Sequence, residues 1–278
     1  SDAEWSFLGY DSGYRMSEVG ATLPQWMALS EAVDADPWVV VGSGNTPRDW
    51  EAVISYLAAP AGYDAAARQR AQHGRTAPWT DAFDRIYLEV GNEWWNPIFR
   101  PFYLWDAARY AELCSLIFER VRAHPHFDPD KLVLIAGGWA INAHHWNGRV
   151  DALTEGHDRI SIAPYLVHEL DEYASPEARW RTLFADVSAY ARHGGASTRK
   201  DLAENGKGTP LAVYEINTHS THGAAPASAT SAIAPSVTAG VAVLDQTLSV
   251  LSTLGAAPVC YYQLTQRAFG RGEQRREG

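Results

Sequence analysis

The chain has 278 residues, of which 46% are hydrophobic and 20% charged, and its formal net charge is −10. This composition is typical of a globular protein with a sizeable core and excludes a disordered chain. The excess of acidic residues disfavours nucleic acid and anionic membrane surfaces as partners, because both carry negative charge. A neutral or cationic substrate fits this charge better. Two cysteines are too few for a disulfide framework.

The N-terminal residues lack the basic stretch and apolar run of a signal peptide. Short apolar runs then predict six strands. They have the length and the unbroken hydrophobicity of parallel strands that are covered on both faces. In chain order they occupy residues 38–42, 85–91, 131–136, 159–165, 211–216 and 259–264.

Helical patterns alternate with these runs. One helix is expected to begin at Thr46-Pro47, because threonine caps helices and proline suits the first helical position. The other predicted helices span residues 23–33, 104–122, 178–192 and 237–254.

The last of these helices carries an apolar stripe. It consists of Val237, Val241, Leu244, Leu248 and Leu251, which recur every three or four residues. This spacing predicts that the stripe faces the core. The surrounding segment, residues 232–258, is poor in charge but contains proline, glycine and aspartate, which favours a packed helix over a membrane span.

Strands that alternate with helices predict an α/β fold with a parallel sheet. We expect a TIM (β/α)8-type barrel formed by residues 1–278 as a single catalytic domain. The alternative is a doubly wound open sheet, whose signature is a glycine-rich phosphate loop. Gly42-Ser43-Gly44 lacks the third glycine of that loop, so dinucleotide binding is disfavoured and no cofactor is expected.

Two glutamates lie at strand exits. Glu93 follows the second run within Gly91-Asn92-Glu93, and Glu215 lies near the end of the fifth run. Barrel enzymes place catalytic groups at the carboxyl ends of their strands. A buried carboxylate destabilises the fold unless it is paired or hydrogen-bonded, so two such residues call for a functional explanation.

Paired carboxylates are what glycoside hydrolysis requires. One protonates the leaving oxygen, and the other attacks the anomeric carbon or activates water. Both residues could instead be salt-bridged structural groups, but the occurrence of two favours catalysis. We expect the pKa of Glu93 to be raised by the neighbouring tryptophans and by the charge of Glu215, which stays ionised.

Asn92-Glu93 and Glu215 resemble the catalytic motifs of the clan A glycoside hydrolases. The resemblance implies a retaining enzyme on a (β/α)8 barrel, with Glu93 as acid/base on strand four and Glu215 as nucleophile on strand seven. The strand count agrees, because two runs, which would be strands five and six, lie between the two assigned strands. Asn92 would then hydrogen-bond the 2-hydroxyl of the sugar.

Within the clan, three segments are similar to the family 51 α-L-arabinofuranosidases. They are residues 42–46, 87–93 and 214–217. Ile216 replaces the tryptophan of that family's nucleophile turn, and Trp94-Trp95 after the acid/base is unlike the family. The count also leaves strands one and two without counterparts in residues 1–37. We therefore expect six strands, three to eight, of an incomplete barrel.

Other polar and aromatic side chains near the strand exits are candidates for carbohydrate contact. Aromatic faces stack on the C–H surfaces of sugars, and polar groups bond their hydroxyls. Ordinary packing is an equal alternative for each tryptophan, and Tyr165 is a candidate partner of Glu215. The candidate substrate-binding residues are Asn92, Trp94, Trp95, Asn96, Trp139, His145, Trp146, Tyr165, His168, Asn217, His219 and Gln263.

Two histidine pairs, His144-His145 and His219-x-x-His222, raise the question of a metal. Neither has a cysteine or carboxylate at ligand spacing, so no metal site is expected. The sequence thus predicts a retaining glycoside hydrolase that cleaves O-glycosidic bonds in an oligo- or polysaccharide, and its resemblance implies an activity like that of an α-L-arabinofuranosidase. The alternative is a non-catalytic carbohydrate-binding barrel or an inactive, truncated fragment. The compartment and the oligomeric state are left open.

Overall fold

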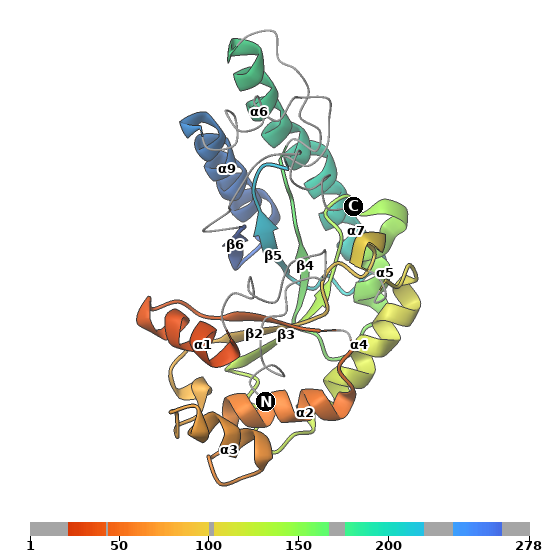
Figure 1. The fold of residues 1–278 in the computed structure, drawn as a ribbon. Helices are drawn as coiled ribbons and strands as arrows, with labels where there is room; N and C mark the ends of the chain where they lie inside the picture. Colours follow the sequence, from red (N-terminus) through yellow and green to blue (C-terminus); the bar gives the residue numbers. More distant parts are fainter. Residues whose placement is uncertain (1–21, 43, 100–102, 167–175, 220–235, 263–278) are drawn as a thin grey trace. The chain divides into compact units, whose positions relative to one another are not determined.

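A computed structural model describes residues 22–42, 44–99, 103–166, 176–219 and 236–262 (Figure 1). The chain forms two compact units. The first comprises Ser1–Gly137 and Leu153–Arg159, and the second comprises Gly138–Ala152 and Ile160–Gly278. Each unit is built around parallel strands that follow one another in chain order.

The first unit contains three strands: β1 (Trp38–Val41), β2 (Ile86–Val90) and β3 (Leu132–Gly137). β2 lies between the other two and is parallel to both. Its alternate residues Ile86, Leu88 and Val90 are fully buried on one face, as the unbroken apolar run predicts. The opposite face of β2 carries Tyr87 and Glu89.

Four helices accompany these strands, together with short 3₁₀ turns at Trp79–Asp81 and Pro97–Phe99. The helices are α1 (Leu23–Ala32), α2 (Pro47–Ala58), α3 (Ala65–Gln72) and α4 (Ala107–Arg122). α2 begins where the sequence predicts, because Thr46 and Asp49 form a reciprocal capping box. α4 begins three residues later than the predicted 104, since Asp106 caps it by accepting hydrogen bonds from two backbone N–H groups.

The second unit also contains three parallel strands: β4 (Arg159–Ile162), β5 (Leu211–Ile216) and β6 (Val259–Tyr261). β5 lies between the other two. β4 ends at Ile162, three residues before the predicted end at 165, because the chain turns at Pro164. β6 begins as predicted, and its described part ends at Tyr261.

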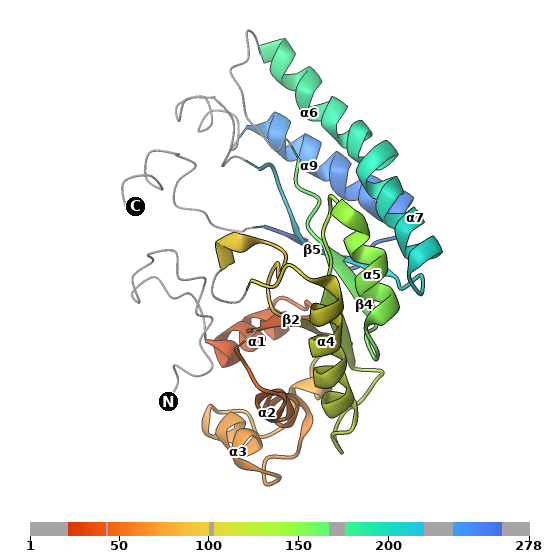
Figure 2. The same ribbon diagram turned by 90° about the vertical axis from the view of Figure 1, so that its right-hand side faces the viewer.

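The helices in the described part of the second unit are α5 (Trp146–Leu153), α6 (Pro176–Tyr190), α7 (Ala196–Asn205) and α9 (Val237–Ser249). A π-helical turn, Ala191–Gly195, joins α6 to α7 in one continuous rod, and α9 lies beside it (Figure 2). The sequence predicts α6 at residues 178–192, close to its observed bounds. A second π-helical turn, Val250–Leu254, extends α9, so the predicted span 237–254 is helical throughout but not wholly α.

The predicted orientation of α9 is wrong. All five residues of its apolar stripe are exposed, from 42% at Leu251 to 82% at Val237. The buried face instead carries smaller or polar side chains, among them Ala242, Val243 and Gln246. Val237–Leu254 is also long and apolar enough to cross a membrane, by a test of length and composition that core helices pass too.

Six parallel strands alternate with helices. This confirms the predicted fold class, which is a (β/α)8-type barrel that lacks two of its eight strands. Within residues 22–37, which the structure describes, α1 is the only helix or strand element before β1. In the ladders of their own units, β1 pairs with β2 alone and β6 with β5 alone.

Candidate active site

Glu93 lies in a turn with a constrained backbone. Gly91 and Glu93 both have positive φ angles, 67° and 43°. A Cβ atom at position 91 would lie 1.9 Å from the indole nitrogen of Trp94, so only glycine fits there. That indole N–H donates a hydrogen bond of 2.8 Å to the carbonyl of Val90. The turn therefore fixes the exit of β2 and leaves the acidic side chain half-buried.

Asn96 holds the carboxylate of Glu93. Its side-chain amide donates to Glu93 Oε2 at 2.7 Å, and its backbone N–H donates to the Glu93 carbonyl at 2.8 Å. A hydrogen bond to a carboxylate favours the ionised form, which opposes the expected retention of a proton on Glu93. Asn96, predicted to contact substrate, is thus a partner of the candidate acid/base.

The four candidate tryptophans differ in exposure. Trp94 is only 7% exposed and packs against Tyr110 with ring centroids 5.2 Å apart, and Trp146 is only 5% exposed. Neither presents an open ring face for a sugar. Trp95 and Trp139 are half-buried, and so is Asn92.

Glu215 lies on β5 in the second unit. The hydroxyl of Tyr165 donates to Glu215 Oε2 at 2.6 Å, so the hydrogen bond considered from the sequence is present. The Tyr165 ring is flanked edge-on by His219, at 5.6 Å between centroids, and by Tyr262, at 6.3 Å. The carboxylate therefore has a donor whose own orientation is fixed by two rings.

Backbone pairing beyond the strands brings these side chains together. The N–H of Leu166 donates to the carbonyl of Asn217 at 2.9 Å, and that of His219 donates to the carbonyl of Leu166 at 2.7 Å. Asn217 is buried, and its side-chain amide donates to the Tyr262 carbonyl. Asn217, predicted to bind substrate, therefore holds the turn after β5. Tyr262 was missed, although it directly precedes the candidate Gln263.

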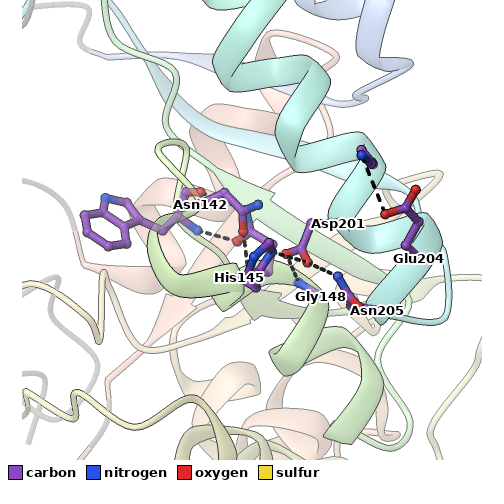
Figure 3. Close-up of polar contacts among 9 residues, drawn as sticks. Asn142, His145, Gly148, Asp201, Glu204 and Asn205 are labelled. Atoms are coloured by element: carbon purple, nitrogen blue, oxygen red, sulfur yellow. Dashed lines mark hydrogen bonds and ion pairs between the residues drawn. The ribbon is translucent and has the colours of Figure 1, made fainter.

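The loop after β3 holds Trp139 and His145 (Figure 3). The Asn147 side chain bonds both the backbone N–H and the carbonyl of Trp139, at 2.7 and 2.8 Å. His145 Nδ1 lies 3.1 Å from Oδ1 of Asp201 on α7, a buried carboxylate that also accepts the N–H of Gly148 at 2.7 Å. No sequence pattern points to Asp201, because it is far from His145 along the chain.

The backbone of this loop is unusual. Asn142, His144 and His145 have φ angles of 51°, 55° and 56°, a region that residues with a Cβ atom seldom occupy. The contact with Asp201 helps to hold this conformation. His145 thus contacts α7, whereas Tyr165, which donates a hydrogen bond to Glu215, follows β4.

The remaining candidates, His168 and Gln263, lie outside the described residues, as does His222. Among the residues that the structure describes, no group of three or more His, Cys, Asp or Glu side chains is arranged to hold a metal ion.

Solved structures with a similar fold are arabinofuranosidases. A family 51 α-L-arabinofuranosidase from Bifidobacterium longum matches with a TM-score of 0.66 and 14% identity, over 90% of this chain and 51% of that one. The fold of this chain is therefore similar to that of about half of the Bifidobacterium protein. An α-L-arabinofuranosidase from Thermotoga maritima, in complex with arabinose, matches with a TM-score of 0.59 and 18% identity, over 96% of this chain and 54% of that one.

A GH51 arabinofuranosidase from Xanthomonas axonopodis pv. citri matches with a TM-score of 0.64 and 17% identity, over 90% of this chain and 50% of that chain. The chain therefore spans about half the length of these proteins. No family model and no curated protein matches the sequence. At these identities the similarity establishes the fold of the barrel and not the reaction.

Proposed function

We propose that this protein is a retaining glycoside hydrolase in which Glu215 is the nucleophile and Glu93 the acid/base. The observation that carries the proposal is the 2.6 Å hydrogen bond from Tyr165 to Glu215, on a strand of a chain with an arabinofuranosidase fold. A phenol that donates to a carboxylate stabilises its ionised form, which is the form that attacks carbon.

The reaction has two displacements. Glu215 attacks the anomeric carbon while Glu93 gives its proton to the leaving oxygen, which forms a covalent glycosyl–enzyme. Glu93, now ionised, then takes a proton from water, and this water releases the sugar from Glu215. Retention by this route requires the two carboxyl groups to lie about 5 to 5.5 Å apart, which remains a prediction.

For the substrate we propose an α-L-arabinofuranoside at the end of an oligo- or polysaccharide. The support is the name shared by the three similar structures. Asn92, Trp95, Trp139 and His219 are the half-buried candidates for contact with the sugar. A neutral carbohydrate also fits a chain whose net charge is −10. The reaction as proposed uses no metal or cofactor.

A second candidate is a barrel that binds carbohydrate without cleaving it. The observation that favours it is the length of the match, about half of each arabinofuranosidase chain. In that case the aromatic and amide groups would bind the sugar, and the two glutamates would serve as hydrogen-bond acceptors only.

Hydrolysis of a panel of 4-nitrophenyl glycosides tests the proposal. We expect release of nitrophenol from the α-L-arabinofuranoside, and no release by the Glu215→Gln variant. Glu112→Gln is the matched control, because Glu112 is an exposed glutamate on α4. Calorimetric binding of arabino-oligosaccharides with no hydrolysis of any glycoside would instead support the binding protein.

A further inference from the structure

A third carboxylate lies in the strand that leads to Glu93. Glu89 is only 2% exposed and precedes Glu93 by four residues. The indole N–H of Trp38, on the neighbouring strand β1, donates to Glu89 Oε2 at 3.0 Å. A hydrogen bond donated to a carboxylate favours its ionised form, so this contact supports a negative charge on Glu89.

Glu89 lies on the more open face of its sheet. Strand alternation puts it on the same face as Tyr87, whose ring stacks on Trp38 at 5.7 Å. Trp38, Val40 and Tyr87 are partly exposed, whereas Ile86, Leu88 and Val90 on the other face are buried. In a barrel the face that is not covered by helices points inward, toward the region where substrates bind at the strand ends.

Two titratable groups that interact with Glu89, Tyr110 and Cys114, stay neutral. Burial, first of all, raises the pKa of Tyr110 well above its usual value of 10.0, and it raises the pKa of the Cys114 thiol as well. The Tyr110 hydroxyl bonds the Val90 carbonyl and the Gly137 N–H, at 3.0 and 2.7 Å. Both groups remain protonated through neutral pH, so they add no charge at the end of β2.

Gly137 leaves room beside this carboxylate. A Cβ atom at position 137 would lie 3.1 Å from the Tyr110 hydroxyl and 3.6 Å from Glu89 Oε1. The glycine thus allows the hydroxyl and Glu89 Oε1 to approach β3 closely. The carboxylate of Glu93, in turn, accepts a hydrogen bond from the neutral amide of Asn96.

We propose that Glu89 is a positioning residue whose negative charge keeps the proton on Glu93 at neutral pH. The inference rests on the proposed function, since only an acid/base needs to hold a proton there. Four residues of strand and turn keep the two Cα atoms within about 14 Å. Two carboxylates at such distances shift each other's titration by about half to one pH unit.

The charge of Glu89 opposes the amide of Asn96. The amide favours an ionised Glu93, whereas a negative charge nearby disfavours it. The two effects together would bring the pKa of Glu93 close to neutral pH. A residue that first donates a proton and then accepts one works best at such a pKa. Glu89 itself is not expected to touch the substrate.

Titration of the Glu93 carboxyl carbon by NMR tests this in the full chain. In Glu89→Gln we expect the Glu93 midpoint to fall by about half to one pH unit. The basic limb of the pH profile of kcat/KM for the arabinofuranoside should fall by the same amount. Glu112→Gln, the exposed control, should move neither, and Glu89→Asp, which keeps the charge, should stay close to wild type. An unchanged Glu93 midpoint in Glu89→Gln overturns the proposal.

Two further arms keep the test decisive. If Glu89→Gln does not fold, the wild-type titration decides: coupling predicts a second inflection of the Glu93 signal at the midpoint of Glu89, and a single inflection refutes it. If the wild-type chain hydrolyses no glycoside but the Glu93 midpoint moves in Glu89→Gln, the proposed function fails and the charge coupling stands. If the wild-type chain hydrolyses the arabinofuranoside but the Glu93 midpoint does not move in Glu89→Gln, the proposed function stands and the charge coupling is refuted.

Discussion

The two strand exits hold their glutamates in different ways. At the end of β2, Glu93 sits in a turn whose backbone is constrained by positive φ angles and by the ring of Trp94. Glu215 instead lies within β5, in regular strand conformation, and is held by the phenol of Tyr165. One residue is positioned by its backbone, and the other by a side chain from the neighbouring segment.

The difference matches the two proposed roles. A nucleophile must stay ionised and meet one carbon atom, so a strand and a short hydrogen bond suit it. An acid/base must exchange a proton with a leaving group and then with water, so it suits a turn where its carboxylate is half-exposed. The proposed roles thus assign an ionised carboxylate to β5 and a carboxyl group with an exchangeable proton to the exit of β2.

The largest expected effect is at the nucleophile. Glu215→Gln keeps the shape of the side chain and removes the attacking oxygen anion, so turnover should fall by about 10³-fold or more. Steady-state hydrolysis of a 4-nitrophenyl arabinofuranoside measures it. Retention of more than a tenth of the wild-type rate would show that Glu215 is not the nucleophile.

The acid/base should respond differently to the leaving group. Glu93→Ala should slow substrates with poor leaving groups by about 10²- to 10⁴-fold, because the departing oxygen then lacks a proton donor. An activated aryl glycoside needs little protonation and should lose far less in its first step. Rates across aryl glycosides of increasing phenol pKa provide the measurement, and equal losses throughout would contradict the assignment.

The constrained turn predicts a loss of stability. Gly91→Ala places a Cβ against the Trp94 ring at a positive φ angle. Gly74, with φ of 96° and nothing within 4 Å of its Cβ position, is the matched control. Gly74→Ala should cost about 1–2 kcal/mol of unfolding free energy from backbone strain alone, and Gly91→Ala about 1–3 kcal/mol more from overpacking.

Denaturant unfolding followed by tryptophan fluorescence measures both glycine variants. A similar cost for the two would mean that Trp94 does not constrain the exit of β2, and that the turn is held by its backbone alone.

The smallest effect should come from Tyr165→Phe. The variant removes the donor to Glu215 and keeps the ring between His219 and Tyr262. Loss of this bond makes the ionised carboxylate less favourable, so the acidic limb of the rate profile should move to higher pH by about one unit. A pH profile of kcat/KM that is unchanged on its acidic side would show that the phenol does not support the nucleophile.

The fold was largely predictable because its signals are local. Each strand is a short apolar run, and α2 starts at a threonine whose hydroxyl caps it. The glutamates at the strand exits were visible for the same reason, since a carboxylate interrupts an otherwise apolar segment. Such patterns need no knowledge of which other segment lies beside them.

Features that depend on distant partners were not predictable. α9 is apolar on nearly every side, so its sequence does not show that Ala242 and Val243 face the core while Leu244 is exposed. Likewise, a tryptophan after a strand can stack on a sugar or pack on the protein, and Trp94 packs because Tyr110 lies beneath it. The contact of His145 with Asp201 joins a loop to a helix far along the chain.

The most direct test of the central claim is covalent trapping of the glycosyl–enzyme. A 2-deoxy-2-fluoro arabinofuranosyl compound with a good leaving group should form the intermediate and slow its release. We predict a single sugar adduct, found by peptide mass mapping on Glu215 and lost in Glu215→Gln. An adduct on any other residue, or hydrolysis of arabinofuranosides with inversion and no adduct, would contradict the proposed mechanism.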